Sequence, residues 1–254
     1  MTRFERAFIT GASSGIGRAI ALKLAGRGTL VVVTARRREL LDELVAEIEG
    51  AGGRALAAEL DVRDTDWVRR EMERLDGEVG GFDLVLANAG VGRAVHATRL
   101  DWDAVSDVVD VNFRGALATL VAGKGLMLPR GRGTLAAVSS LAGTRGMATS
   151  GAYSASKAGL QAFLETLEID LGQSGLKVVD IQPGFVRTPM TDNQKFPMPF
   201  LVEVDTAAEH CLRGLEAGKS VISFPWQLAW PTRTLGRYLP RTLWRLLSRM
   251  STPS

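Results

Sequence analysis

The sequence predicts an α/β fold in which a doubly wound parallel sheet carries helices on both faces. Short apolar runs alternate with amphipathic stretches over most of the 254 residues, and this alternation favours parallel strands joined by helical crossovers. One run, residues 30–35, is too apolar to have a wet face, which is typical of a strand covered on both sides. The length fits one domain, and no repeat or Pro-rich boundary divides it.

The elements follow in strict β/α order. Strands are expected at residues 4–10, 30–35, 55–60, 83–87, 134–139, 177–181 and 221–224. Helices are expected at residues 15–27, 39–49, 66–78, 102–123, 153–171 and 206–217. In the first of these helices, Ile16, Ile20 and Leu24 recur every four residues and so share one buried face.

Composition excludes several classes of protein. Apolar residues make up 46% and charged residues 23%, which is ordinary for a globular chain and argues against disorder. Cys211 is the only cysteine, so neither an intrachain disulfide nor the usual zinc spacing is expected. His96 and His210 are isolated, and no metal site is expected. Because no signal peptide or membrane-spanning run is visible, we expect a cytoplasmic protein.

The charge is small but unevenly placed. After Glu216 there is no acidic residue, while Lys219 and five arginines follow. Removing these six charges from the net charge of +3 leaves about −3 for the rest of the chain. No basic patch with interleaved aromatic residues is present, so nucleic-acid binding is not expected.

A glycine-rich turn lies between the first strand and the first helix. A helix that begins there offers unpaired N–H groups and its positive dipole end to an anion, and glycines let the backbone approach a pyrophosphate. An ordinary strand-to-helix turn is the alternative for a glycine-rich string taken alone. The residues expected to cradle phosphates are Gly11, Ser13, Ser14, Gly15, Ile16 and Gly17.

Together with motifs farther along the chain, this turn resembles the cofactor loop of the short-chain dehydrogenase/reductase family. The similarity covers residues 4 to about 190 in the order of the family. The matching motifs are Thr10-Gly11-Ala12-Ser13-Ser14-Gly15-Ile16-Gly17, Asp61-Val62, Asn88-Ala89-Gly90, Asn112, Ser139-Ser140, Tyr153-Ser154-Ala155-Ser156-Lys157, and Pro183-Gly184 with Thr188.

The resemblance implies a Rossmann fold in the compact, single-domain branch of the family. The domain would span residues 1–254, with residues 226–250 as a basic amphipathic extension. The implied activity is hydride transfer between a nicotinamide cofactor and a small carbonyl or alcohol substrate, as in a carbonyl reductase. A homodimer or homotetramer is also expected. A non-catalytic cofactor-binding or interaction protein that retains the fold is the alternative.

The end of the second strand favours NADP(H) over NAD(H). An acidic residue there would bind the adenosine ribose, but the position holds Ala35, followed by three arginines. A guanidinium can bind a 2′-phosphate through charge-assisted hydrogen bonds. By similarity to the family, Arg36 is the expected partner and Arg37 a helper, the alternative being a solvated helix start. Ser14 stands where many NADP-dependent relatives carry a second basic residue.

Tyr153 and Lys157 are four residues apart at the start of a helix and therefore share one face. A carbonyl reduction needs a proton donor at the oxygen, and a phenol with an ordinary pKa of about 10 is a reluctant one. A nearby ammonium and an oxidised nicotinamide would both favour the phenolate and lower the pKa of Tyr153. By resemblance, Lys157 also binds the nicotinamide ribose.

Two further polar residues complete the expected catalytic set. Ser140 precedes Tyr153 by the family's usual separation and could stabilise charge on the substrate oxygen, although Ser139 remains the alternative. Asn112 lies inside an apolar helix, where a satisfied core residue is the plain interpretation. By resemblance, it holds a water that continues a proton relay from Lys157.

The remaining cofactor contacts come from the carboxyl ends of later strands, where ligands bind in open α/β sheets. Asp61 and Val62 are expected at the adenine. Small residues are expected behind the cofactor and near the nicotinamide, with Thr188 bonding the carboxamide. These contacts are Asn88, Ala89, Gly90, Pro183, Gly184, Val186 and Thr188.

Substrate contacts are expected from Leu141, Met147, Phe185 and residues 190–201, which include Phe196, Met198 and Phe200. Their apolar side chains favour a hydrophobic substrate, or they pack a lid.

The tail alternates basic and apolar residues, and Pro240 should divide it into two short helices. Such a tail could close the pocket or contact another subunit, while attachment to a membrane surface is the less favoured alternative. The arginines are Arg233, Arg237, Arg241, Arg245 and Arg249, and the apolar residues are Trp230, Leu235, Leu239, Leu243, Trp244 and Leu247.

Overall fold

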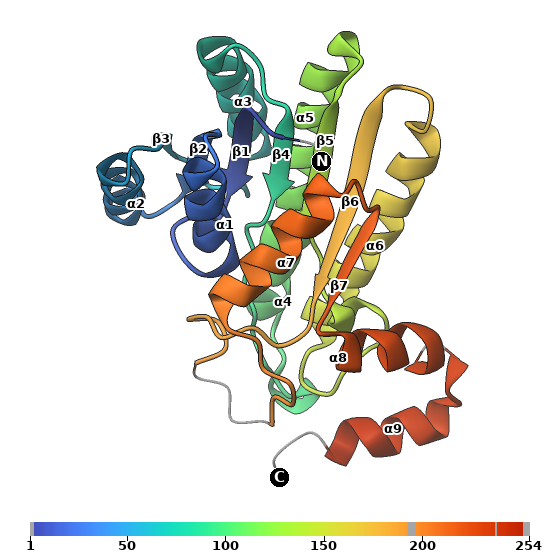
Figure 1. Ribbon diagram of the computed structural model, residues 1–254. Coiled ribbons are helices and arrows are strands. Elements are labelled where there is room, and N and C mark those ends of the chain that lie inside the picture. Colours follow the sequence, from blue (N-terminus) through green and yellow to red (C-terminus); the bar gives the residue numbers. More distant parts are fainter. Residues whose placement is uncertain (1–2, 193–196, 237, 251–254) are drawn as a thin grey trace.

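The protein is built around a seven-stranded sheet whose paired strands are all parallel (Figure 1). A computed structural model describes residues 3–192, 197–236 and 238–250, without the side chains of residues 246, 247, 249 and 250. The strand order is β3-β2-β1-β4-β5-β6-β7. The strands are β1 (Arg6–Thr10), β2 (Leu30–Ala35), β3 (Arg54–Glu59), β4 (Leu84–Ala87), β5 (Gly133–Val138), β6 (Leu176–Pro183) and β7 (Val221–Phe224).

Helices connect successive strands and cover both faces of the sheet, so the doubly wound prediction is confirmed. The α-helices are α1 (Gly15–Gly26), α2 (Arg38–Gly50), α3 (Thr65–Val79), α4 (Trp102–Val109), α5 (Ala116–Met127), α6 (Gly151–Asp170), α7 (Val204–Glu216), α8 (Trp226–Pro231) and α9 (Arg241–Met250). The expected seven strands are all present, with ends that differ from the prediction by at most two residues.

Two apolar cores hold the layers together. On one face, α1, α2 and α7 pack through residues such as Ile20, Leu44 and Leu212. On the other face, α3, α5 and α6 pack through residues such as Met72 and Leu120. Successive residues of β1 point to opposite cores, which is why this strand is apolar throughout.

The central helix differs from the prediction of one continuous element over residues 102–123. It consists of α4, a π-helical segment η2 (Asp110–Gly115) and α5. A Cβ at Gly115 would lie 2.9 Å from the backbone oxygen of Val62, so only glycine permits this close approach to the loop after β3. The wider turn places Asn112 inside the molecule, where it is completely buried.

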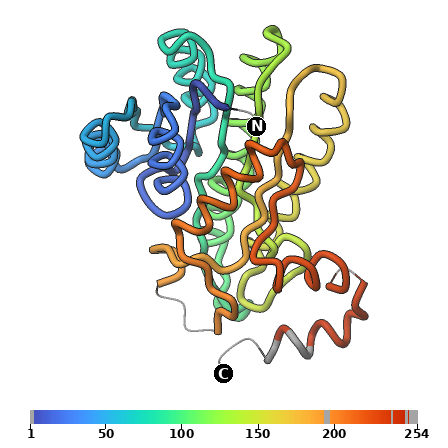
Figure 2. The backbone as a smooth tube through the Cα atoms, in the orientation of Figure 1, coloured from blue at the N-terminus to red at the C-terminus, as the bar shows by residue number. Residues whose placement is uncertain are grey.

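The strand order reverses between β1 and β4, because β2 and β3 lie on one side and β5 to β7 on the other. In open α/β sheets, ligands bind outside the carboxyl ends of the strands at such a switch point. Both views show α8 and α9 lying at this same end of the sheet (Figures 1 and 2). As predicted, Pro240 separates the two parts of the tail, and α9 begins at the next residue.

Candidate active site

The turn between β1 and α1 forms an open cradle. Gly11 and Gly15 adopt φ angles of +67° and +58°, which a side chain would strain. Any Cβ at Gly11 would lie 2.6 Å from the Cα of Ala89, so glycine is required for the close approach. Ser14 caps α1 without a side-chain hydrogen bond, unlike Asp64, which caps α3 by accepting from Trp67 N. The first N–H groups of α1 are therefore free to bind phosphate.

Asn88 fixes this turn from the end of β4. Its Nδ2 donates to the carbonyl oxygens of Thr10 and Gly11, at 2.9 and 3.1 Å. The hydroxyl of Thr10 accepts from the backbone N–H groups of Asn88 and Ala89, each at 3.1 Å. A Cβ at Gly17 would lie 2.8 Å from Gly11 O, so this glycine lets α1 pack against the turn.

The arginines after β2 occupy three different environments. Arg36 and Arg37 are exposed and line the cavity beside the cradle. Arg37 Nη2 donates to Ser13 Oγ at 2.8 Å and to Ser14 Oγ at 3.2 Å, which places its guanidinium directly on the cradle. Arg38 instead pairs with Asp42 on the surface of α2. Two of the three cations therefore face the same cavity.

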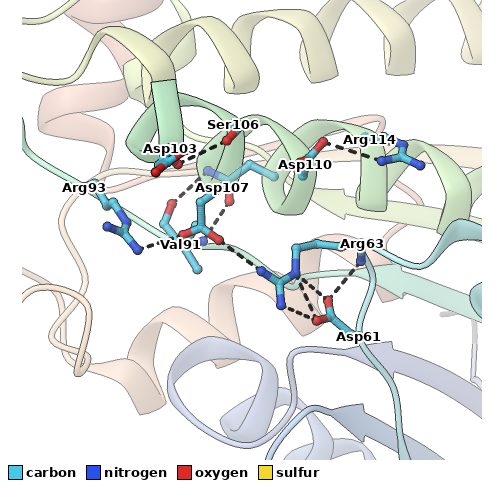
Figure 3. A network of polar contacts seen from close by, with 10 residues as sticks. Asp61, Arg63, Val91, Arg93, Asp103, Ser106, Asp107, Asp110 and Arg114 are labelled. Carbon is cyan, nitrogen blue, oxygen red and sulfur yellow. Dashed lines mark hydrogen bonds and ion pairs between the residues drawn. The ribbon is translucent and has the colours of Figure 1, made fainter. Parts of the chain in front are cut away.

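Asp61 lies at the end of β3, where Arg63 engages its carboxylate (Figure 3). Burial alone would raise the pKa of Asp61, but the bonds with Arg63 outweigh it and hold that pKa below its usual value. Asp107 of α4 extends the network, lying 3.4 Å from Arg63 Nη1 and 3.1 Å from Arg93 Nη2. The carboxylate at the expected adenine position is thus already neutralised by a neighbouring cation.

Tyr153, Lys157 and Ser140 come together at the carboxyl end of β5. The ammonium of Lys157 lies 5.7 Å from the centre of the Tyr153 ring and donates to Val138 O at 2.7 Å. Lys157 is almost completely buried, whereas Tyr153 is half-buried and lines the cavity together with Ser140. One phenol, one hydroxyl and one ammonium therefore share a single site.

Burial controls the proton affinities in this site. It raises the pKa of the Tyr153 phenol above the usual value, and a hydrogen-bonding interaction with Ser140 opposes the rise. The direction differs from the decrease that a neighbouring cation predicts, because desolvation of the phenolate dominates. Burial also lowers the pKa of Lys157 to about 8, against the opposing charge of Asp180.

The two adjacent serines point in different directions, as alternation along a strand requires. Ser139 Oγ bonds the carboxylate of Asp180 and the carbonyl of Ile181. Ser140 Oγ accepts from Ala142 N at 3.1 Å and donates to Pro183 O at 3.3 Å. Of these two serines, Ser140 is the one whose hydroxyl interacts with the Tyr153 phenol and lines the second cavity as well as the first, which favours Ser140 as the substrate-facing hydroxyl.

Asn112 supports the site from behind. Its Oδ1 accepts from Val91 N at 2.7 Å, while its Nδ2 donates to Val91 O at 2.9 Å and to Ser156 Oγ at 3.4 Å. A Cβ at Gly90 would contact both Asn112 Oδ1 and Lys157 Nζ, at 3.4 and 3.7 Å. The π-helical segment thus ties the loop after β4 to the helix that carries the lysine.

The loop after β6 forms the opposite wall. Thr188 lies close to the cradle, since a Cβ at Gly15 would be 3.2 Å from its Cγ2. The backbone N–H of Thr188 donates to Thr191 Oγ1 at 2.9 Å, and this bond shapes the loop. Pro183, Gly184 and Val186 also line the cavity.

One cavity of about 390 Å³ unites nearly all the residues expected at the cofactor. Gly17 and Asn112 lie outside its lining, at the packing positions described above. Met190 and Thr191, the first residues of the expected range 190–201, line this cavity and also the second one described below. Sequence patterns gave no signal for several apolar residues that also line this first cavity. These are Leu60, Val91, Val111, Val138 and Pro189.

A second cavity, of about 240 Å³, shares Ser140 and Tyr153 with the first. The expected substrate contacts Leu141, Met147 and Phe185 line it. Met198 and Phe200 do not, and Phe200 is 54% exposed. Phe196 lies outside the described residues. The tail contributes wall residues that were not singled out as substrate contacts: Leu228, Thr232 and Trp244.

The tail docks onto the loop between Ser140 and Tyr153. Arg145 Nη1 donates to Gly236 O at 2.9 Å and to Leu239 O at 2.7 Å, and its guanidinium stacks on Trp244. Trp244 Nε1 donates to Gly146 O at 2.7 Å. The tail therefore covers the second cavity of its own chain.

Other apolar tail residues face outward. Trp226, Trp230 and Tyr238 are 74%, 64% and 82% exposed. Arg233, Arg241 and Arg245 are exposed as well. Arg237 and the side chains of Leu247 and Arg249 lie outside the described residues.

Neither a metal centre nor a membrane span emerges from the described parts of the chain. Within them, no three His, Cys, Asp or Glu side chains group as metal ligands would. None of the described helices combines the length and apolar character needed to cross a bilayer. His96 has a local structural role, since its Nδ1 accepts a hydrogen bond from the backbone N–H of Thr98.

Comparison with known proteins agrees with this geometry. Residues 5–197 match the family described as short chain dehydrogenase. An uncharacterized oxidoreductase of Myxococcus xanthus is 47% identical over 246 residues, which cover 97% of each chain. A short-chain type dehydrogenase/reductase from Mycobacterium marinum superposes with a TM-score of 0.80 at 27% identity, covering 89% of this chain and 96% of that one.

A second solved structure was determined with a ligand. It is an alcohol dehydrogenase from the archaeon Thermococcus sibiricus, complexed with 5-hydroxy-NADP. Its TM-score is 0.77 at 27% identity, covering 87% of this chain and 94% of that one.

Proposed function

Since the chain belongs to the short-chain dehydrogenase/reductase family, we propose that it is an NADP(H)-dependent oxidoreductase that interconverts a carbonyl compound and its alcohol. Membership of the family makes it an oxidoreductase that binds a nicotinamide cofactor. The observation that carries the proposal is the position of Tyr153 and Ser140. Both line the cavity beside the cradle and the smaller cavity next to it. A proton donor at this junction can serve a substrate that reacts with a cofactor.

The cofactor would lie in the larger cavity with its pyrophosphate on the first turn of α1. The first turn of α1, which Ser14 caps without a side-chain hydrogen bond, and the close approach at Gly11 fit such a group. When bound, the nicotinamide would supply or accept the hydride. Thr188, on the wall opposite the cradle, would bond its carboxamide.

Charge supports NADP(H) as the form used. Arg36 and Arg37 would bind the 2′-phosphate, Arg37 from its position on Ser13 and Ser14. Arg37 would therefore supply, next to Ser14, the basic group that Ser14 itself does not provide. Asp61 would not repel the phosphate strongly, because Arg63 neutralises it. The Thermococcus sibiricus relative, which is complexed with an NADP derivative, supports the same choice.

The catalytic steps follow from three side chains. Tyr153 would give its proton to the carbonyl oxygen in reduction and take it back in alcohol oxidation. Ser140 would donate a hydrogen bond to the same oxygen and stabilise the charge that develops there. Lys157, with a pKa of about 8, stays mainly protonated at neutral pH and favours the phenolate by its charge. Asn112 would act by positioning Lys157 and the loop at Val91.

The chain would work as one domain of residues 1–254 with the extension 226–250, in a cytoplasmic homodimer or homotetramer. Exposed apolar side chains such as Val121 on α5 and Ile169 on α6, 50% and 74% exposed, support contact with a second copy. Neither nucleic acid nor a metal ion would take part in this activity.

NADPH consumption with a panel of aldehydes and ketones tests the proposal. Tyr153→Phe removes the transferable proton but keeps the ring, so turnover should fall by about 10²–10⁴-fold while NADPH affinity changes little. Tyr238→Phe is the matched control, because the only other tyrosine is 82% exposed and lines neither cavity. NADPH binding without any turnover by the native protein would favour the non-catalytic alternative, and full activity of Tyr153→Phe would refute the assignment.

A further inference from the structure

The smaller cavity contains only one kind of charge. Its lining is mostly apolar, with Leu141, Met147, Phe185 and Leu228 among the wall residues. The charged groups that line it in the described parts of the chain are all arginines, Arg93 and Arg145, and no carboxylate joins them. An apolar cavity of this kind has a net positive potential unless carboxylates outside the cavity neutralise its arginines.

The two arginines differ in this respect. Arg93 is exposed and pairs with Asp107 at 3.1 Å, so its charge is already compensated (Figure 3). Arg145 is half-buried, and its contacts among the described residues are the carbonyl oxygens of Gly236 and Leu239 and the ring of Trp244. Carbonyl groups and an aromatic face orient a guanidinium but do not cancel its charge.

The remaining donors of Arg145 make no hydrogen bond to the described residues. Both carbonyl bonds use Nη1, while the guanidinium carries five N–H donors. A carboxylate accepts two parallel N–H bonds from such a group, and the interaction is strengthened by the apolar surroundings. A partly buried cation that has no acidic partner among the described residues is what a site for an anion requires.

The position of Arg145 also fixes which end of a substrate it can hold. Ser140 and Tyr153 line both cavities, whereas Arg145 and Trp244 line only the smaller one. A group bound to Arg145 therefore lies away from the reacting oxygen and beneath the tail. The volume of about 240 Å³ is below the roughly 300–1,000 Å³ of pockets for drug-sized ligands, which indicates a compact substrate.

We infer that the substrate is a compact oxo or hydroxy acid, whose carboxylate binds Arg145 while an apolar middle part contacts the cavity wall. This inference rests on the proposed function, because it identifies the chemical group at the end of the substrate that lies away from the carbonyl reacting at Tyr153. It makes Arg145 a specificity-determining residue, and it gives the docked tail the task of enclosing the bound anion.

Matched acids and amides test the inference. The first pair is para-formylbenzoate and para-formylbenzamide, which differ in charge but hardly in shape, and the second is levulinate and levulinamide. In at least one pair, kcat/KM for the acid should exceed that for the amide at least tenfold, as expected for charge-assisted hydrogen bonds. Calorimetric titration of the protein–NADPH complex with para-methylbenzoate and para-methylbenzamide measures the same preference without turnover.

Three variants separate recognition from support of the tail. Arg145→Gln should reduce the acid-to-amide ratio of kcat/KM to within about twofold of one. Arg93→Gln, which changes a compensated arginine in the same cavity, should keep the ratio of the native protein. Trp244→Phe removes the hydrogen bond to Gly146 O and loosens the tail, so it should change kcat/KM for acid and amide by similar factors.

Each outcome decides between the two proposals. Turnover of the amides with no preference for the acid in either pair would overturn the inference and leave the proposed function standing. So would an acid preference that survives in Arg145→Gln. Binding of para-methylbenzoate without turnover of any carbonyl compound would instead refute the proposed function. If the native protein neither turns over any carbonyl compound nor prefers para-methylbenzoate to para-methylbenzamide, both the inference and the proposed function are overturned.

Discussion

The buried ammonium of Lys157 predicts a measurable pH dependence of folding stability. Its pKa is lowered from 10.5 to about 8, chiefly because burial removes the cation from water. The unfolded chain keeps this proton to a higher pH than the folded protein does. Between about pH 8 and pH 10.5 the unfolded state therefore binds more protons, and the free energy of unfolding rises with pH. Below pH 8 both states are protonated and the full cost of burial remains.

The size of the effect follows from the two pKa values. Lowering the pKa of Lys157 from 10.5 to about 8 makes the folded protein roughly 3 kcal/mol less stable at neutral pH. Most of this, about 2.5 kcal/mol, should be regained between pH 7 and pH 10. Lys157→Met lacks the titrating group, so its free energy of unfolding should show no such rise between pH 7 and pH 10. The variant also leaves Val138 O without its donor, but that penalty is nearly independent of pH and cancels when the two pH values are compared.

Urea unfolding of the cofactor-free native protein and of Lys157→Met, at about pH 7, 8.5 and 10, measures the effect. From pH 7 to pH 10, the free energy of unfolding of the native protein should rise by about 2–3 kcal/mol relative to that of Lys157→Met. Lys219→Met is the control, because Lys219 is exposed and its replacement should shift stability equally at every pH. A difference between native protein and Lys157→Met that stays constant from pH 7 to pH 10 would show that Lys157 is not a buried cation.

Two further predictions concern the cofactor and the tail. Arg36→Asp should shift preference from NADPH toward NADH by at least about tenfold, because a carboxylate would replace a 2′-phosphate partner, while Arg38→Asp should change it little since Arg38 lies outside the cavity. Ratios of Kd for the two cofactors check this, and equal affinity of the native protein for both would contradict it. The full-length protein should not sediment with anionic vesicles at low salt, because Trp244 is engaged with its own chain. Salt-sensitive vesicle binding that is lost on deletion of residues 226–250 would identify the tail as a surface anchor.

Much of the fold could be predicted because local signals and tertiary structure agree. The run at residues 30–35 becomes β2 without change, since a β-branched apolar segment has no other stable place than a covered strand. The glycines at positions 11 and 15 indicated the cradle because their positive φ angles are a backbone requirement. Spacing also favoured Ser140 over Ser139, and the alternation of side chains along the chain gives the same preference.

The sequence could not indicate features that depend on contacts between distant segments. The π-helical segment around Asn112 has the same apolar periodicity as the helices beside it. It can be recognised only in the folded structure, where the backbone N–H and C=O of Val91 both form hydrogen bonds with the Asn112 amide. Arg145 beneath the tail is likewise an ordinary surface arginine in the sequence. Folding joins Arg145 to carbonyl groups more than ninety positions later in the chain.

Because residues 226–250 close the smaller cavity, the parts of the site become complete at different times during translation. The cradle, the sheet and Tyr153 all precede the tail in the chain, so a nascent chain contains every residue that lines the larger cavity before Trp244 has been synthesised. At about 5–20 residues per second, the ribosome needs roughly one to five seconds for this last stretch. If the proposed function holds, a newly made molecule would bind its cofactor while the smaller cavity is still open, and the wall that encloses the substrate would be completed only with α9.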